Sequence, residues 1–134
     1  MLHLGMTTIL VADYDEARAF FTRAFGFVTL EDTPLSAQKR WLVMGPRGGN
    51  GARLLLAKAT SADQRARIGK QGGDSHGRVM FFLETDDFDR DYARMHQASV
   101  RFRELPRRED YGRVVVFEDL YGNRWDLIEP TPGN

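Results

Sequence analysis

The stretch RVVVFEDLYGNRWDLIEP, residues 113–130, decides the fold of this chain. It predicts a strand over 113–118, a tight turn at 121–123 and a second strand over 124–129. The Gly-Asn pair gives the backbone freedom that a hairpin turn requires, and the flanking Val, Phe, Trp and Ile favour extended chain. Asp126 stands in the middle of the second strand. A carboxylate there is costly unless it faces water, a cation or a ligand cavity, so Asp126 is a candidate functional residue.

Length and composition indicate one globular domain of 134 residues with a hydrophobic fraction of 42%. The formal net charge is zero, which gives no electrostatic reason to bind nucleic acid or an anionic membrane. Cysteine is absent, which excludes disulfides, thiolate catalysis and Cys-ligated metal sites. No apolar run approaches the roughly 20 residues of a transmembrane helix, and the N-terminus lacks the features of a signal peptide. We therefore expect a soluble, cytoplasmic protein that binds neither nucleic acid nor a membrane.

The first half of the chain predicts one module over about residues 5–58. It begins with a β-branched strand, followed by a helix that Asp13 or Asp15 caps and Gly26 ends. The Gly-rich loop 46–51 joins two strands and opens no helix, which favours a hairpin loop over a phosphate cradle. The predicted elements are a strand at 6–11, a helix from about 13 to 24, and strands at 27–31, 39–44 and 53–58.

The second half predicts a similar module over about residues 78–130. Between the modules, 61–69 predict one or two helical turns, and 70–77 (KQGGDSHG) have the composition of a linker. The second module has a helix capped by Asp86 or Asp87. Its predicted elements are a strand at 79–85, a helix at 88–96, a strand at 100–105 and the final hairpin.

The two modules repeat each other. Residues 10–15 match 84–89 at an offset of 74, and Arg40 matches Arg113 at an offset of 73, as do the two Gly-Asn pairs. Each half therefore predicts strand–helix–strand–strand–strand, an α+β fold of tandem βαβββ modules within a single domain. We expect their strands to form a curved mixed sheet around a shared cleft, which is the expected ligand site.

The chain resembles the vicinal oxygen chelate superfamily, which contains glyoxalase I, bleomycin-resistance proteins, extradiol dioxygenases and fosfomycin-resistance enzymes. The resemblance lies in ILVADYDEARAFFTRAFGF, in the matching FFLETDDFDRDYARM, and in the F-x-D-x-x-G-N-x-x-x-[LI] pattern of the final hairpin. It covers residues 6–129 and implies the glyoxalase-like fold. Metal-using members of the family hold a divalent ion with His or Glu from the first and last strand of each module.

The resemblance implies that the metal site is degenerate here. The four metal positions fall on Met6, on Leu54 (or Leu56 if the register slips by two), on Met80 and on Asp126. Of these, Asp126 alone is a ligand of the usual kind, because thioether and alkyl groups do not bind hard or borderline divalent ions usefully. We therefore expect no cofactor. The alternative is a divalent metal held by Asp126 and His76.

The same positions predict an apolar ligand site. Met6, Leu54, Met80 and Phe82 would line the cleft, which suits an apolar or aromatic small molecule. Trp41 would stack on a planar ligand, as the resemblance to bleomycin-binding proteins implies, or would belong to the core. Trp125 has the opposite strand parity to Asp126 and is therefore expected in the core.

Three charged residues are candidates for polar contacts with the ligand. If Arg40 and Arg113 both turn inward, they form a pair of guanidinium groups for a carboxylate or phosphate; if they turn outward, they are surface charges. Asp126 either faces the cleft, together with Glu84, or pairs with an arginine such as Arg124.

These observations favour a non-enzymatic protein that sequesters a small molecule, and the family resemblance implies a homodimer. One alternative is an enzyme, either a divergent metal-dependent lyase similar to lactoylglutathione lyase or a dioxygenase. Another is a scaffold or regulator of a protein partner, with the cleft filled by side chains. The fold does not identify the ligand, because the superfamily places resistance proteins, isomerases and oxygenases on one scaffold.

Overall fold

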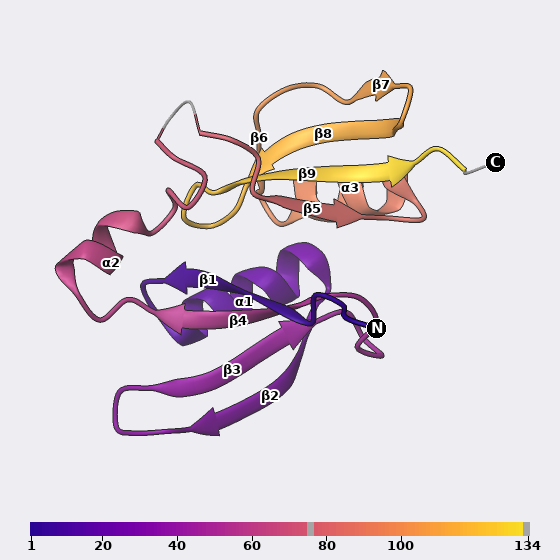
Figure 1. Ribbon diagram of the computed structural model, residues 1–134. Helices are drawn as coiled ribbons and strands as arrows, with labels where there is room; N and C mark the ends of the chain where they lie inside the picture. Colours follow the sequence, from indigo (N-terminus) through magenta and orange to yellow (C-terminus); the bar gives the residue numbers. More distant parts are fainter. Residues whose placement is uncertain (75–76, 133–134) are drawn as a thin grey trace. The chain divides into compact units, whose positions relative to one another are not determined.

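The chain forms two compact units, Met1–Ile68 and Gly69–Asn134, in a computed structural model that describes residues 1–74 and 77–132. In each unit a helix lies against one face of a mixed sheet (Figure 1). This arrangement confirms the predicted α+β fold. The division falls after Ile68, so the predicted linker 70–77 belongs to the start of the second unit.

Unit 1 contains the elements predicted for the first module, with small shifts at their ends. Its sheet has the order β1-β4-β3-β2, in which β1 and β4 are parallel and the other pairs antiparallel. The elements are β1 (Met6–Val11), α1 (Tyr14–Phe25), β2 (Val28–Pro34), β3 (Arg40–Gly45), β4 (Arg53–Lys58) and α2 (Ala62–Arg67).

Local sequence signals set the bounds of α1. Asp13 caps it, because its Oδ2 accepts a hydrogen bond of 2.8 Å from Glu16 N. Gly26 ends it with φ of 68°, in the left-handed region that glycine adopts without strain. The buried side of the helix packs on the sheet through Ala17, Phe20, Phe21 and Ala24, and the buried strand residues on that face are Ile9, Val11, Leu42, Met44, Leu54 and Leu56.

Unit 2 repeats the plan with one additional short strand. Its elements are β5 (Phe81–Glu84), α3 (Phe88–Gln97), β6 (Arg101–Phe102), β7 (Arg107–Glu109), β8 (Gly112–Glu118) and β9 (Arg124–Pro130). The sheet order is β5-β9-β8-β6, with β7 paired to β8. The strand predicted at 100–105 is wrong in extent: the chain leaves the sheet after Phe102 and returns as β7. Of the helices in the part of the chain that the structure describes, none is long and apolar enough to cross a membrane.

A row of aromatic rings marks the helix-facing side of this second sheet. Trp125 stacks on Phe81 with ring centroids 4.5 Å apart and lies 6.0 Å from Phe117. Phe102 continues the row, 6.3 Å from Phe117 and 4.7 Å from Tyr92 of α3. Trp125 is 3% exposed, which confirms its predicted place in the core. Because side chains alternate along a strand, Asp126 lies on the opposite face.

The turn between β8 and β9 is built around the Asp119 carboxylate. This side chain is buried and accepts five hydrogen bonds of 2.9–3.1 Å: from the backbone N–H groups of Tyr121, Gly122 and Asn123, from Asn123 Nδ2 and from Trp125 Nε1. Burial raises the pKa of Asp119, while these donors act in the opposite direction. The Asp-x-x-Gly-Asn pattern therefore encodes a turn whose N–H groups converge on one acceptor.

Candidate functional site

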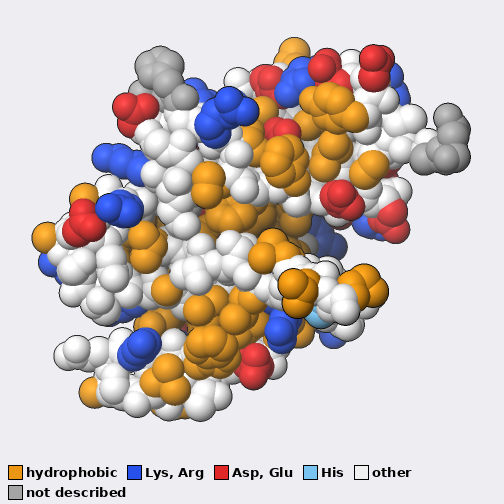
Figure 2. Space-filling view, viewed as in Figure 1, with side chains coloured by type: hydrophobic (Ala, Val, Ile, Leu, Met, Phe, Trp, Pro, Cys, Tyr) orange, Lys and Arg blue, Asp and Glu red, His pale blue; other side chains and the backbone are white. Residues whose placement is uncertain are grey.

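Unit 1 contains a pocket of about 410 Å³, formed by residues of β1, β3, β4 and α2, by Tyr14 at the start of α1, and by the loops beside them. Its apolar lining includes Leu10, Leu35, Trp41 and Leu55, and its polar lining includes Lys39 and Lys58. Figure 2 shows hydrophobic side chains gathered over β3 and β4 of this unit. The volume lies within the roughly 300–1,000 Å³ of small-molecule sites.

The strand register decides which predicted residues share the face of Trp41. Val43 pairs with Leu55, and Thr8 also pairs with Leu55, so these residues lie on the side of the sheet away from α1. By alternation Trp41 and Met6 lie on the same side. Trp41 therefore lines a pocket. The sequence alone allowed two places for this side chain, a ligand pocket or the core.

Leu54 does not share a face with Met6. Met6 pairs with Arg53, so Leu54 pairs with Thr7 on the helix-facing side, where it is 5% exposed. The register alternative, Leu56, is also buried on that side. Leu56 nevertheless borders the pocket, and the β4 residues that line it from the far face are Leu55 and Ala57, which the sequence analysis did not single out.

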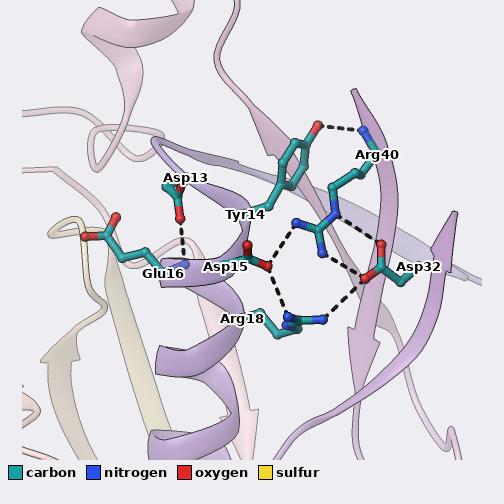
Figure 3. A network of polar contacts seen from close by, with 7 residues as sticks. All are labelled: Asp13, Tyr14, Asp15, Glu16, Arg18, Asp32 and Arg40. Carbon is teal, nitrogen blue, oxygen red and sulfur yellow. Dashed lines mark hydrogen bonds and ion pairs between the residues drawn. The ribbon is translucent and has the colours of Figure 1, made fainter. Parts of the chain in front are cut away.

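Arg40 attaches α1 to the sheet of unit 1 (Figure 3). Its guanidinium carbon lies 5.1 Å from the ring centroid of Tyr14, the first residue of α1. Its Nη1 donates to Asp15 at 3.0 Å, and its Nη2 and Nε donate to Asp32 of β2 at 2.8 and 3.1 Å. The hydrogen bond from Arg40 is the largest cause of a lowered pKa at Asp32. Arg18 joins the same two carboxylates.

Arg113 makes the equivalent contacts in unit 2. Its guanidinium carbon lies 4.4 Å from the ring centroid of Phe88, the first residue of α3, and its Nη1 donates to Asp89 at 2.8 Å. The predicted symmetry of the two arginines is therefore present. However, both guanidinium groups contact the first turn of their own helix, so the structure does not bring them together as an anion-binding pair.

Asp126 lies on the far face of the unit 2 sheet, between Phe82 of β5 and Val116 of β8. It is 6% exposed, and its Oδ1 is buried without a hydrogen-bond partner among the described residues. Met80 and Phe82, at 41% and 64% exposure, are large apolar side chains that reach the surface. Phe82 pairs with Asp126, and Glu84, two residues further along β5, lies on the same face of the sheet.

The charged neighbours of Asp126 come from the end of the strand predicted at 100–105 and from the residues after it, to which the sequence analysis gave no role. Burial raises the pKa of Asp126, the charge of Arg107 lowers it, and the charge of Glu104 raises it. Glu104 Oε2 accepts from Val116 N at 3.1 Å and from Arg107 Nε at 3.0 Å. Arg124, the predicted partner of Asp126, instead donates from Nη1 to the Gly77 carbonyl at 3.0 Å. No feature of the sequence at residues 104–110 (ELPRRED) distinguished Glu104 and Arg107 from ordinary surface charges.

The side chains at the projected metal positions do not fit a divalent ion. Met80 offers a thioether, Leu54 an alkyl group, and the strand neighbours of Asp126 are Phe82 and Val116, none of which is a hard ligand. In the part of the chain that is described, no three His, Cys, Asp or Glu side chains gather at a spacing that could hold a metal. His76, the partner of Asp126 in the enzymatic alternative, lies outside the described residues.

Comparison with known proteins matches nearly the whole chain to one family. The family model described as Glyoxalase/Bleomycin resistance protein/Dioxygenase superfamily matches residues 3–127. An uncharacterized protein of Shewanella frigidimarina is 50% identical over 90% of this chain and 88% of its own length. The crystal structure of UcmS2 has a TM-score of 0.79 at 28% identity, covering 96% of this chain and 98% of its own. TnmS3, an antibiotic binding protein from Streptomyces sp. CB03234, has a TM-score of 0.73 at 26% identity, with 98% of each chain covered.

Proposed function

Because the chain belongs to the glyoxalase/bleomycin resistance protein/dioxygenase superfamily, we propose that it is a small-molecule binding protein that holds an apolar or aromatic ligand without a metal ion. The observation that carries this proposal is the pocket of about 410 Å³ in unit 1, in which Trp41 offers an indole ring beside aliphatic side chains. An aromatic ring at the wall of an apolar pocket favours a flat ligand.

The similarity to TnmS3, which is described as an antibiotic binding protein, supports the same proposal. That protein matches this chain over almost its full length, at an identity of 26%. We therefore propose that the ligand is of antibiotic or metabolite size rather than a macromolecule. We also propose that the protein is a homodimer, as the family resemblance implies.

Titration with 1-naphthylmethanol, a neutral aromatic probe, tests the binding function. We expect saturable binding by calorimetry, with the affinity at least tenfold lower in Trp41→Ala, because the loss of one aromatic contact is worth about 1.4 kcal/mol. Arg94→Ala, an exposed change on α3 outside the pocket lining, is the control and should bind as the wild type does. Binding that is absent, or that is equal in wild type and Trp41→Ala, would contradict the proposal.

Metal content separates this function from the enzymatic alternative. The purified protein is incubated with Mn, Fe(II), Ni and Zn, desalted and analysed by elemental mass spectrometry. We expect no near-stoichiometric ion, because the side chains at the projected positions supply one carboxylate and no second hard ligand. A retained ion that is lost in Asp126→Ala would overturn the metal-free proposal and favour a lyase or dioxygenase.

A further inference from the structure

Unit 2 carries a buried acceptor that the described residues leave unsatisfied. Asp126 is 6% exposed, and its Oδ1 accepts no hydrogen bond from any described group. Buried polar atoms in folded proteins nearly always have a partner, because an unpaired one retains its full desolvation cost. An exception in the middle of a regular strand leaves this oxygen available to a donor from outside the described residues.

The surroundings of this acceptor are apolar and open. Phe82, directly across from Asp126 on β5, is 64% exposed, and Met80 at the start of the same strand is 41% exposed. Val116 flanks Asp126 on the other side. The opposite face of the sheet is filled by the row of aromatic rings, so the far face is the side from which a ligand can reach the carboxylate.

The local charge favours a cation over an anion. Asp126 and Glu104 contribute two carboxylates to this face, and Arg107 contributes one guanidinium. Arg107 is already engaged, since its Nε donates to Glu104 at 3.0 Å and its Nη1 lies 3.4 Å from Glu109 Oε2. The remaining contact of Arg107 is with the Tyr111 hydroxyl at 3.5 Å. A ligand group that pairs with the Asp126 carboxylate should therefore donate hydrogen bonds and carry a positive charge.

We propose that Asp126 anchors the protonated amine of a small aromatic ligand, whose apolar body packs on Phe82 and Met80. This inference goes beyond the proposed function, because it adds a second binding surface, on unit 2, that shares no residue with the pocket of unit 1. An ammonium group supplies N–H donors and a charge that the carboxylate compensates, while the flat apolar side chains around it contact the rest of the molecule. The same charges disfavour aromatic carboxylates on this face of unit 2.

Three probes that share one ring system test the assignment. The wild-type protein is titrated by calorimetry with 1-naphthylmethylamine, 1-naphthylmethanol and 1-naphthoate at neutral pH, where the amine is protonated. We expect the amine to bind at least tenfold more tightly than the alcohol, and the carboxylate to bind more weakly than either. In Asp126→Asn the preference for the amine should disappear, while the affinity for the alcohol stays within about twofold, because the side-chain shape is kept.

Glu84→Gln is the matched control. Glu84 is an exposed carboxylate on the same face of β5, so its removal lowers the local negative charge without touching the buried acceptor. We expect the preference for the amine to persist in this variant. Equal binding of amine and alcohol by the wild type would overturn the inference and leave the proposed function in place. A preference that survives in Asp126→Asn would also overturn it, and binding of none of the three probes would overturn both proposals.

Discussion

A carboxylate at position 126 is unfavourable for folding and useful for binding. Burial raises the pKa of Asp126 above its ordinary value, since Arg107 compensates the charge only in part. An unfolded Asp titrates near 3.9, so the ionised side chain opposes folding at any pH above its folded pKa. This penalty disappears as the pH falls through that folded value towards the unfolded one.

Replacing Asp126 by Asn should therefore stabilise the protein. We expect the free energy of unfolding at pH 7 to rise by about 1 kcal/mol, because the variant buries no charge, and we expect the gain to shrink as the pH is lowered to about 4. Urea denaturation at a series of pH values measures both effects. Glu84→Gln, in which the replaced carboxylate is exposed, should stay within about 0.5 kcal/mol of the wild type. A less stable Asp126→Asn protein at pH 7 would contradict this account of the side chain.

Neighbouring leucines in β4 should differ in the effect of truncation. Leu54 is buried on the helix-facing side, so Leu54→Ala should lower the free energy of unfolding by about 2–5 kcal/mol. Leu55 is half-buried in the pocket lining, so Leu55→Ala should cost less stability and should weaken binding of 1-naphthylmethanol. Urea denaturation and calorimetry of the two variants measure this split. The reverse pattern would mean that the register is shifted by one residue.

Among the elements, the β8–β9 hairpin depends most on a single side chain. Five N–H groups converge on the Asp119 carboxylate, and all five lose this acceptor in Asp119→Ala, although Gly122 N keeps its hydrogen bond to the Asp119 carbonyl. We expect this variant to lose about 3 kcal/mol of unfolding free energy, because several largely buried donors lose a charged acceptor. Asp119→Asn should lose less, since one acceptor oxygen remains.

The control for this prediction is Asp110→Ala, an exposed change in the turn between β7 and β8. It should alter the unfolding free energy by less than about 0.5 kcal/mol. If Asp119→Ala is no less stable than Asp110→Ala, the hairpin is not held by the carboxylate.

Elements with a strong periodic or turn signal were predictable, and elements without one were not. Helices α1 and α3 follow from Asp caps and apolar spacing, and the final hairpin follows from β-branched residues around Gly-Asn. By contrast, β7 is the charged stretch RRE, which has no strand propensity and forms because it pairs with β8. Its contribution to the surroundings of Asp126 could therefore not be anticipated from the sequence.

The face of the sheet on which a site residue lies was predictable wherever polar and apolar residues alternate along the strand. Asp126 stands between Trp125 and Leu127, so the alternation of polar and apolar residues fixes its face. Residues 54–56 are three consecutive leucines, which carry no alternation and leave the register ambiguous by one. The internal repeat correctly identified Arg40 and Arg113 as equivalent positions of the two units. It could not predict in which direction their side chains point.

For the whole molecule, we predict a homodimer. Large apolar side chains are exposed at Leu2, Leu4, Leu105 and Tyr111 in the described part of the chain, and association would remove such surface from water. Size-exclusion chromatography with light scattering should give twice the 15.3 kDa mass of the chain. A mass of 15.3 kDa that does not change across micromolar concentrations would contradict this prediction.

The arginine contacts that both units share have a consequence for altering this protein. In each unit an arginine of the sheet lies over the first aromatic ring of the helix and pairs with the acid that follows, Arg40 with Tyr14 and Asp15, and Arg113 with Phe88 and Asp89. Arg40 and Tyr14 also border the pocket of unit 1, whereas the strand faces that carry Trp41 and Asp126 take no part in these contacts. Ligand specificity can therefore be redesigned by libraries confined to those faces, while the attachment of both helices is inherited unchanged.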